Sequence, residues 1–174
     1  MGRYRPPQPV GSKYITPEGK ARLQEELDFL WLKRRPEVTR ALSAAAAEGD
    51  RSENAEYIYR KKELREIDGR VRHLRKRLEG MTVVDRIPDD TGKVYFGAWV
   101  RLLDKQDQEH CYRIVGPDEF DHAAGYISMD SPMGKMLLGK ELDAELTLTL
   151  PATAEDDNRN GYYTIIEISY ASPG

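Results

Sequence analysis

The sequence predicts an α+β protein, in which an N-terminal antiparallel coiled-coil hairpin precedes a small antiparallel β-sheet domain with one short helix. Apolar residues recur with a seven-residue spacing over residues 57–81, which is typical of a coiled coil. Beyond residue 82, short runs of β-branched and aromatic residues replace this spacing. The net charge also changes sign there, from +6 over residues 1–80 to −9 over residues 81–174, which indicates two modules.

The composition is that of a folded protein with long exposed helices. The 174 residues are 39% hydrophobic and 33% charged, and the net charge is −3. The single cysteine, Cys111, excludes an internal disulfide and a multi-cysteine metal site. No apolar run approaches the ~18 residues needed to span a membrane, and the first residues lack the apolar segment of a secretory signal. We therefore expect a cytoplasmic protein that has no membrane partner.

The first arm of the hairpin follows a tail. Residues 1–13 are polar and rich in proline, so we expect them to be flexible, and the hairpin is predicted over residues 14–81. Its first helix starts at Pro17, because the missing N–H of proline costs nothing at that position. The apolar stripe of this helix consists of Leu23, Leu27 and Leu30. Pro36 should bend the helix, since proline removes one backbone hydrogen bond and crowds the preceding turn.

The second helix has the clearer pattern. Its two interleaved seven-residue series are Tyr57, Leu64, Val71 and Leu78, and Ile67, Leu74 and Met81. Arg60 interrupts this seam near the bend, and Gly80 is placed to end the helix. Because a short bend joins the two helices, they must run antiparallel. That pairing brings the leucine stripe of the first helix onto Ile67 and Val71.

Residues 82–174 are predicted to form the sheet domain. The runs that indicate strands are residues 94–96, 99–103, 110–115, 126–129, 146–150 and 162–170. Turn residues such as Gly116-Pro117-Asp118 separate these runs. Between two of them, residues 131–139 predict a short helix that Ser131 caps and Gly139 closes.

The bend between the helices, residues 44–57, concentrates acidic side chains, and two of them have two interpretations. The spacing of Asp50 and Glu53 is that of a capping box, in which Asp50 accepts a backbone N–H and Glu53 reaches back. Two carboxylates at the end of a rod are also oxygen ligands for a hard cation such as Mg²⁺. They make a poor closed site by themselves, so such a metal would be shared with a partner.

A band of cations lies behind the bend on both helices. This basic band consists of Arg34, Arg35, Arg40, Arg60, Lys61, Lys62 and Arg65. Charges on exposed helices are usually solvated and linked by salt bridges. Clustered Lys and Arg on one element are also the footprint of nucleic-acid binding. An acidic bend ahead of a basic band is hard to explain by solubility alone.

Other candidate residues give weaker signals. His73, His110 and His122 have no ligand spacing to one another. Residues 118–121 and the segment Asp130-Ser131-Pro132 lie in predicted loops, where they form either exposed turns or a docking edge. The sequence contains no glycine-rich phosphate loop, no nucleophile elbow and no cysteine–histidine metal pattern.

With these residues in place, the chain resembles the bacterial Gre-type transcript cleavage factors and is most similar to their B subtype. The segment Gly49-Asp50-Arg51-Ser52-Glu53-Asn54-Ala55-Glu56-Tyr57 matches the tip motif of that family. A second segment, Leu64-Arg65-Glu66-Ile67-Asp68, follows at the position where it occurs in that family. Residues 112–121 and residues 127–132 match its other signatures, so the likeness extends from about Lys13 to Tyr170.

The resemblance implies a transcription elongation factor that is not an enzyme on its own. Residues 82–174 would form an FKBP-like domain that docks on RNA polymerase through Asp130, Ser131 and Pro132. The hairpin would enter the secondary channel, where Asp50 and Glu53 would help to hold a Mg²⁺ shared with the polymerase. The basic band would hold the backtracked nascent RNA, which the polymerase would then cleave. We expect the free protein to be a monomer.

Two other functions remain open at this point. One is a regulator that enters the polymerase channel and inhibits transcription without cleavage, although the pair Asp50 and Glu53 argues against it. The other is a coiled-coil dimerisation protein, which Arg60 in the seam disfavours. The chain also departs from the family pattern at Gly69 and in the acidic loop 155–161, and both departures lie away from the tip.

Overall fold

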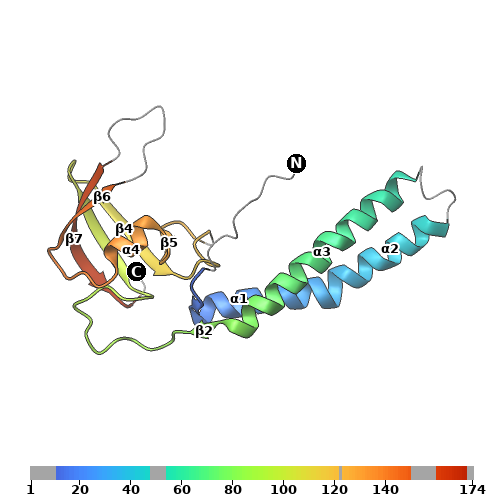
Figure 1. Ribbon diagram of the computed structural model, residues 1–174, viewed down its shortest axis with the longest axis horizontal. Helices are drawn as coiled ribbons and strands as arrows, with labels where there is room; N and C mark the ends of the chain where they lie inside the picture. Colours follow the sequence, from blue (N-terminus) through green and yellow to red (C-terminus); the bar gives the residue numbers. More distant parts are fainter. Residues whose placement is uncertain (1–10, 48–53, 122, 150–159, 172–174) are drawn as a thin grey trace, which may run out of the picture. The chain divides into compact units, whose positions relative to one another are not determined.

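The computed structural model of the protein describes residues 11–47, 54–121, 123–149 and 160–171. The chain divides into two compact units, each of which is considered by itself (Figure 1). One unit is the helical hairpin, Glu18–Met81. The other combines Met1–Pro17 with Thr82–Gly174, so it draws on chain segments from both sides of the hairpin.

The first arm of the hairpin is a continuous helix with one wide turn. α1 (Pro17–Asp28) passes into a π-helical segment, η1 (Phe29–Arg34), and then into α2 (Arg35–Ala47). Within the wide turn, the Arg35 N–H donates to the Leu30 carbonyl five residues earlier. The sequence predicts a bend here, and the structure has a π-helical turn.

Two features of the sequence explain this turn. Pro36 follows it directly and has no N–H to continue the α-helical pattern. Leu30 and Val38 both pack in the apolar core of the hairpin, although they are eight residues apart and the heptad spacing is seven. The wide turn takes up the extra residue, so both side chains reach the same seam.

The second arm is the single helix α3 (Ala55–Gly80), which lies antiparallel to α2 (Figure 1). Val38, Ile67 and Val71 are at most 6% exposed and form the centre of the hairpin core. The partly buried side chains around them are Leu27, Leu30 and Leu64. The predicted meeting of the leucine stripe with Ile67 and Val71 is therefore confirmed.

The chain segments that enter and leave the hairpin pair with each other. β1 (Tyr14–Ile15) and β2 (Thr82–Val83) form a two-stranded parallel ladder, with Tyr14 opposite Thr82 and Ile15 opposite Val83. Ile15 is fully buried, so this short ladder is anchored by an apolar side chain as well as by its backbone hydrogen bonds.

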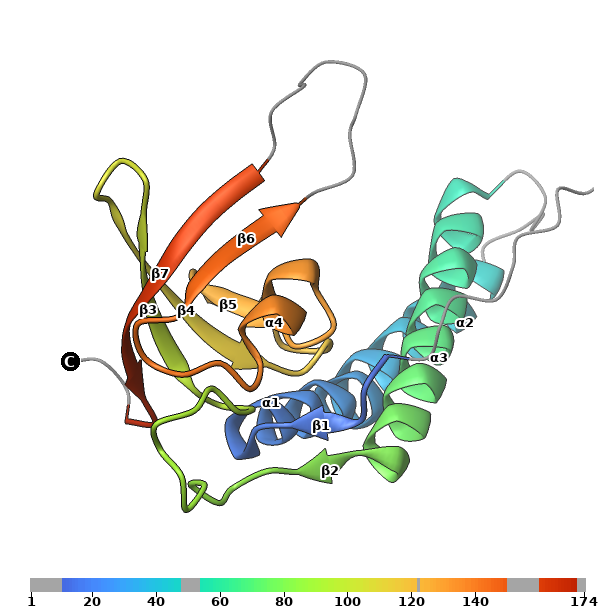
Figure 2. The same ribbon diagram turned by 60° about the vertical axis from the view of Figure 1, so that its left-hand side comes forward.

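The remaining strands form one five-stranded sheet in the order β5-β4-β3-β7-β6 (Figure 2). Its strands are β3 (Trp99–Asp104), β4 (Glu109–Val115), β5 (Tyr126–Ser128), β6 (Glu145–Thr149) and β7 (Asn160–Ser169). Neighbours are antiparallel except β4 and β5, which are parallel. The prediction of an antiparallel sheet holds for three of these four pairs, and the parallel pair is the exception.

One short helix completes the core of the sheet domain. α4 (Pro132–Leu137) is capped by Ser131, whose hydroxyl accepts the Gly134 N–H at 3.0 Å, as the sequence predicts. Leu137 is fully buried against sheet residues that include Leu102, Ile114 and Ile165. The fold is thus α+β, with a helical hairpin and a mostly antiparallel sheet that carries one helix. None of the described helices is long and apolar enough to cross a membrane.

Candidate nucleic-acid interface

The predicted metal ligands Asp50 and Glu53 lie outside the described residues, but the helix ends that flank them are described. α2 ends at Ala47 and α3 begins at Ala55. Asn54 contacts both helices, because its Oδ1 accepts the Tyr57 N–H at 3.0 Å and its Nδ2 donates to the Ala45 carbonyl at 2.9 Å. The N-cap of α3 is therefore Asn54, where the capping-box interpretation places Asp50.

The first turns of α3 present exposed aromatic and apolar side chains. Ile58 is 54% exposed and Tyr59 is 58% exposed, although both are large and apolar. Tyr59 lies under the Arg60 guanidinium at 5.3 Å, and Tyr57 lies under the Lys61 ammonium at 5.5 Å. The part of the hairpin next to the tip is therefore an apolar and cationic surface.

The structure separates the basic band into two sets by exposure. Arg40, Lys61, Lys62 and Arg65 are exposed on α2 and α3. The closest acidic partner of this set within the described structure is Glu66, which lies 3.9 Å from the Lys62 Nζ, and both side chains are more than half exposed. An exposed ion pair of this kind contributes little to stability, so Lys62 can exchange Glu66 for a phosphate.

The other set is half-buried and ion-paired within the hairpin. Arg35 donates to Asp68 at 2.8 Å, and its guanidinium also lies 5.1 Å from the ring centre of Trp31. Arg34 and Arg60 share a single carboxylate, that of Glu63, which links α3 to η1. The structure therefore brings Arg34 and Arg60 of the predicted band together through Glu63, and it leaves three of the seven cations half-buried and paired with acidic residues.

Glu63 is the least exposed acidic side chain in this network, at 16%. Burial by itself raises the pKa of its carboxyl. The hydrogen bonds from Arg60 and Arg34 outweigh this effect, so the pKa lies below its ordinary value of 4.5. The carboxylate is consequently ionised at neutral pH and neutralises part of the band.

The predicted docking segment is tied to the N-terminal part of the same unit. Asp130 Oδ2 accepts the Ser12 N–H at 2.7 Å and the Ser12 hydroxyl at 3.1 Å. Ser131 caps α4, and Pro132 is its first residue. The three residues therefore hold local structure, and Asp130 also fixes residue 12 onto the sheet domain.

The nearby loop 116–121 contains a buried carboxylate. Glu119 is 2% exposed and accepts hydrogen bonds from the Thr16 N–H at 3.1 Å, the Gly116 N–H at 3.0 Å and the Thr16 hydroxyl. A Cβ at Gly116 would collide with the Tyr14 carbonyl, so only glycine fits there. The exposed-turn interpretation of residues 118–121 is wrong for Glu119, because long-range contacts with residues 14–16 bury it.

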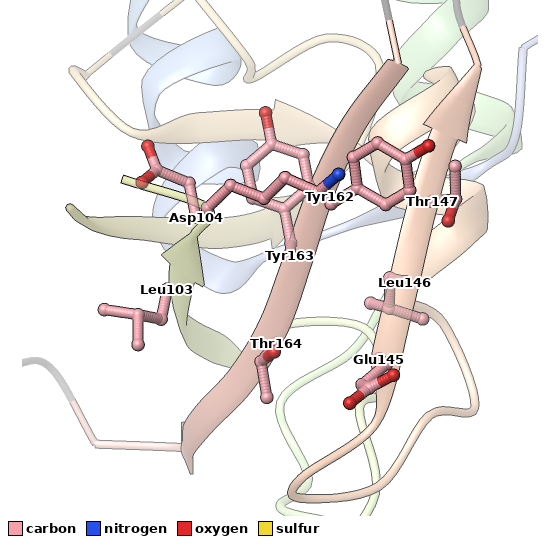
Figure 3. Close-up of a pocket in the computed structure, with 9 residues that line it drawn as sticks. Leu103, Asp104, Glu145, Leu146, Thr147, Tyr162, Tyr163 and Thr164 are labelled. Carbon is pink, nitrogen blue, oxygen red and sulfur yellow. The ribbon is translucent and has the colours of Figure 1, made fainter. Parts of the chain in front are cut away.

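A hollow of about 450 Å³ on the sheet domain is lined by residues of β3, β6 and β7 (Figure 3). The Lys105 Nζ lies 3.3 Å from the ring centre of Tyr162 at its edge. Asp104 also lines it and lies 2.8 Å from His110 Nε2, and this hydrogen bond lowers the pKa of the Asp104 carboxyl. None of the predicted site residues lines this hollow.

Comparison with known protein families covers both units. Residues 13–83 match the domain described as "Transcription elongation factor, N-terminal". Residues 89–170 match the domain described as "Transcription elongation factor, GreA/GreB, C-term". The chain belongs to the GreA/GreB family. It is thus a member of a family of transcription elongation factors, and its two matched regions contain the hairpin and the five-stranded sheet.

Relatives with high identity confirm the predicted likeness to the B subtype. Transcription elongation factor GreB of Pseudomonas aeruginosa is 56% identical over 170 residues, which are 98% of each chain. GreB of Xanthomonas axonopodis pv. citri is 55% identical over 173 residues, which are 99% of each chain. The solved structure of the transcription factor Gfh1 is 23% identical, covers 91% of this chain and 99% of that chain, and has a TM-score of 0.42.

Sequence reasoning on this Gre-family chain missed three contacts at the site. The cross-helix bond of Asn54 and the approach of the Arg75 guanidinium to the ring centre of Trp31, at 4.3 Å, depend on how two helices face each other. The shared carboxylate of Glu63 had a detectable signal. Glu63 lies three residues after Arg60, the charged residue in the seam, and this spacing places both on one helix face.

Proposed function

We propose that this chain binds RNA polymerase, inserts its hairpin into the secondary channel and stimulates the Mg²⁺-dependent cleavage of backtracked nascent RNA. Membership of the GreA/GreB family supports the assignment to transcription elongation. The tip motif at residues 49–57 supports the finer assignment, because it places Asp50 and Glu53 between the two helices. The observation that carries the proposal is the contact of Asn54 with both α2 and α3, which links the two helices that flank this acidic segment in the chain.

Asp50 and Glu53 provide oxygen ligands for a Mg²⁺ ion that the polymerase also holds. Their donor chemistry fits, because Mg²⁺ prefers oxygen and is bound in proteins through one or two carboxylates together with other ligands. A bound Mg²⁺ would lower the pKa of a coordinated water and so would make that water a better nucleophile. Because the polymerase also holds this ion, the protein is not an enzyme on its own.

The exposed cations of the basic band hold the displaced RNA by its phosphates. Arg40, Lys61, Lys62 and Arg65 are exposed, and the ion pair of Lys62 with Glu66 is long. Contacts of this type depend on charge and not on base sequence, which suits a factor that acts on any transcript. The neighbouring exposed Tyr59 adds a ring on which a base can stack.

The sheet domain docks on the polymerase through Asp130, Ser131 and Pro132. The hydrogen bonds of Asp130 with Ser12 and of Ser131 with Gly134 fix the shape of this segment before it meets a partner. A preformed segment loses little conformational entropy on binding. Docking and metal binding thus use different units of the chain.

The test is an RNA cleavage assay on stalled elongation complexes with and without the protein, at fixed Mg²⁺. We expect Asp50→Asn and Glu53→Gln to abolish stimulated cleavage, because each removes a charged ligand, while binding to the polymerase stays close to that of the wild-type chain. Cleavage that survives both substitutions would remove the metal role. Binding and inhibition by the wild-type chain without any cleavage would favour the channel-blocking regulator instead.

A further inference from the structure

Glu63 holds two arginines of the basic band at once. Its Oε2 lies 3.0 Å from the Arg60 Nη1, and its Oε1 contacts the Arg34 Nη2 on the other arm of the hairpin. Arg34 also contacts Glu37 at 3.0 Å, and Arg60 contacts Glu56 at 2.7 Å. The five side chains form one chain of alternating charge across η1, α2 and α3.

The position of Glu63 distinguishes it from the other acids of this network. The side chain of Glu63 is 16% exposed, whereas those of Glu37 and Glu56 are 62% and 55% exposed. Water screens the exposed pairs and makes them weak, but it screens the Glu63 pairs less. Glu63 is therefore the acid that a phosphate must displace before it can bind Arg34 or Arg60.

We propose that Glu63 sets the width of the RNA-binding surface by withholding Arg34 and Arg60 from phosphates. Nucleic acid is then confined to Arg40, Lys61, Lys62 and Arg65, which have no comparable partner in the described structure. This inference rests on the proposed binding of RNA by the basic band. It makes Glu63 a specificity-determining residue that acts through the two arginines and touches no RNA itself.

The experiment measures binding of a fluorescently labelled single-stranded RNA by anisotropy, over a series of salt concentrations, with the full-length chain. Glu63→Gln keeps the size of the side chain but removes the competing charge. We expect binding at low salt to become about threefold to tenfold tighter. The slope of log affinity against log salt should steepen by up to about 1.4, since each added phosphate contact on a single strand contributes about 0.7.

Two controls separate this effect from general changes. Glu79→Gln alters the net charge equally at an exposed position near the end of α3, and it should leave the affinity and the salt slope close to those of the wild-type chain. Glu37→Gln removes an exposed acidic partner of Arg34, and Glu56→Gln removes one of Arg60, while Glu63 remains in place. Each should therefore increase RNA affinity much less than Glu63→Gln. If Glu63→Gln proves poorly folded by circular dichroism, Arg34→Ala tests the same point, because removal of an arginine that Glu63 withholds should leave RNA binding close to that of the wild-type chain, and clearly weaker binding would overturn the proposal.

The outcomes distinguish this inference from the proposed function. Combined alanine substitution of Lys61, Lys62 and Arg65 should weaken RNA binding, and unchanged binding would overturn the role of the basic band itself. If that variant binds weakly but Glu63→Gln binds no tighter than Glu79→Gln, only the role of Glu63 is overturned. An increase in RNA affinity in Glu37→Gln or Glu56→Gln that equals or exceeds the increase in Glu63→Gln would also overturn the role of Glu63.

Discussion

At the scale of single residues, Asn54 makes two contacts that can be removed one at a time or together by substitution. Its Oδ1 caps α3 and its Nδ2 donates to the last turn of α2, so one amide links the two helices next to the tip. An aspartate or serine could provide the cap, but neither could donate a hydrogen bond as an amide does while also accepting one in the same geometry.

Substitution of Asn54 should separate helix capping from positioning of the tip. Asn54→Ala should cost about 1 kcal/mol of stability, because it removes the cap, and it should also lower stimulated cleavage. Asn54→Ser should keep most of the stability, since serine is a good cap, but it should lower cleavage because the bond to Ala45 is lost. Thermal unfolding and RNA cleavage assays provide the two measurements, and full cleavage by Asn54→Ser would contradict the positioning role.

Glu119 also makes more than one side-chain contact, inside the sheet domain. Its charged carboxylate can be buried because Thr16 and Gly116 donate hydrogen bonds to it. Its carboxylate accepts from Thr16 and Gly116 and lies in a loop that a sequence pattern would place at the surface. The partner Thr16 is 103 residues away in the chain, so no local pattern could indicate this burial.

Glu119→Ala should therefore lower the stability of the sheet domain. We expect a loss of about 2 to 3 kcal/mol, because the buried N–H groups of Thr16 and Gly116 lose their acceptor. Asp121→Ala, in the same loop at an exposed position, is the matched control and should change the stability by less than about 0.5 kcal/mol. Urea unfolding followed by tryptophan fluorescence measures both, and equal midpoints for the two variants would contradict the structural role of Glu119.

At the scale of elements, the hairpin is held by an apolar core and by carboxylates that bridge its arms. Glu26 on α1 receives two hydrogen bonds from Arg70 on α3, at 2.6 and 2.8 Å, and Glu63 bridges the arms closer to the tip. The hydrogen bond from Arg70 lowers the pKa of the Glu26 carboxyl, although burial opposes it. The pKa of Glu63 is lowered by its two arginines.

These pKa values predict how the stability of the hairpin depends on pH. Both carboxylates bind protons more weakly when folded, so their contribution is full above about pH 4.5 and is lost as the pH falls through the lower folded values. A Glu26→Gln, Glu63→Gln double variant should show a flatter loss of helical circular dichroism between neutral and acidic pH. Glu25→Gln, at an exposed position, should follow the wild-type profile, and identical profiles for all three proteins would exclude this contribution.

The sequence predicts well what depends on local periodicity. The packing of Leu27 and Leu30 against Ile67 and Val71 follows from the heptad spacing and a short connection, and the Ser131 cap follows from one residue and its neighbours. The parallel pairing of β4 and β5 was not predictable in this way, because both parallel and antiparallel neighbours show the same runs of β-branched residues. The engagement of Arg34 and Arg60 by Glu63 likewise depends on which residues of two helices face each other.

At the scale of the whole molecule, the proposed function assigns binding and chemistry to different parts of the chain. The docking segment belongs to the unit that contains the five-stranded sheet, and the tip belongs to the hairpin unit. A substitution in one unit should therefore leave the task of the other intact. This separation allows one variant to compete with another for the same polymerase.

Asp50→Asn should consequently inhibit the wild-type chain in a mixed cleavage assay. It keeps the docking segment, so stimulated cleavage should fall in proportion to its share of the total protein when polymerase is limiting. Adding Asp130→Ala to the same chain should remove the inhibition, because the docking segment then loses both its carboxylate and the anchor of Ser12. Persistent inhibition by the double variant would show that docking does not depend on Asp130.

The parallel ladder of β1 and β2 has a consequence for how this architecture can be altered. Tyr14 lies opposite Thr82, so the polypeptide leaves the sheet unit and returns to it at neighbouring positions. In topological terms the two-helix arm is an insertion within a discontinuous host domain. An arm of another length or charge could be exchanged as a cassette at these two positions, while the surrounding scaffold keeps its own strand connections.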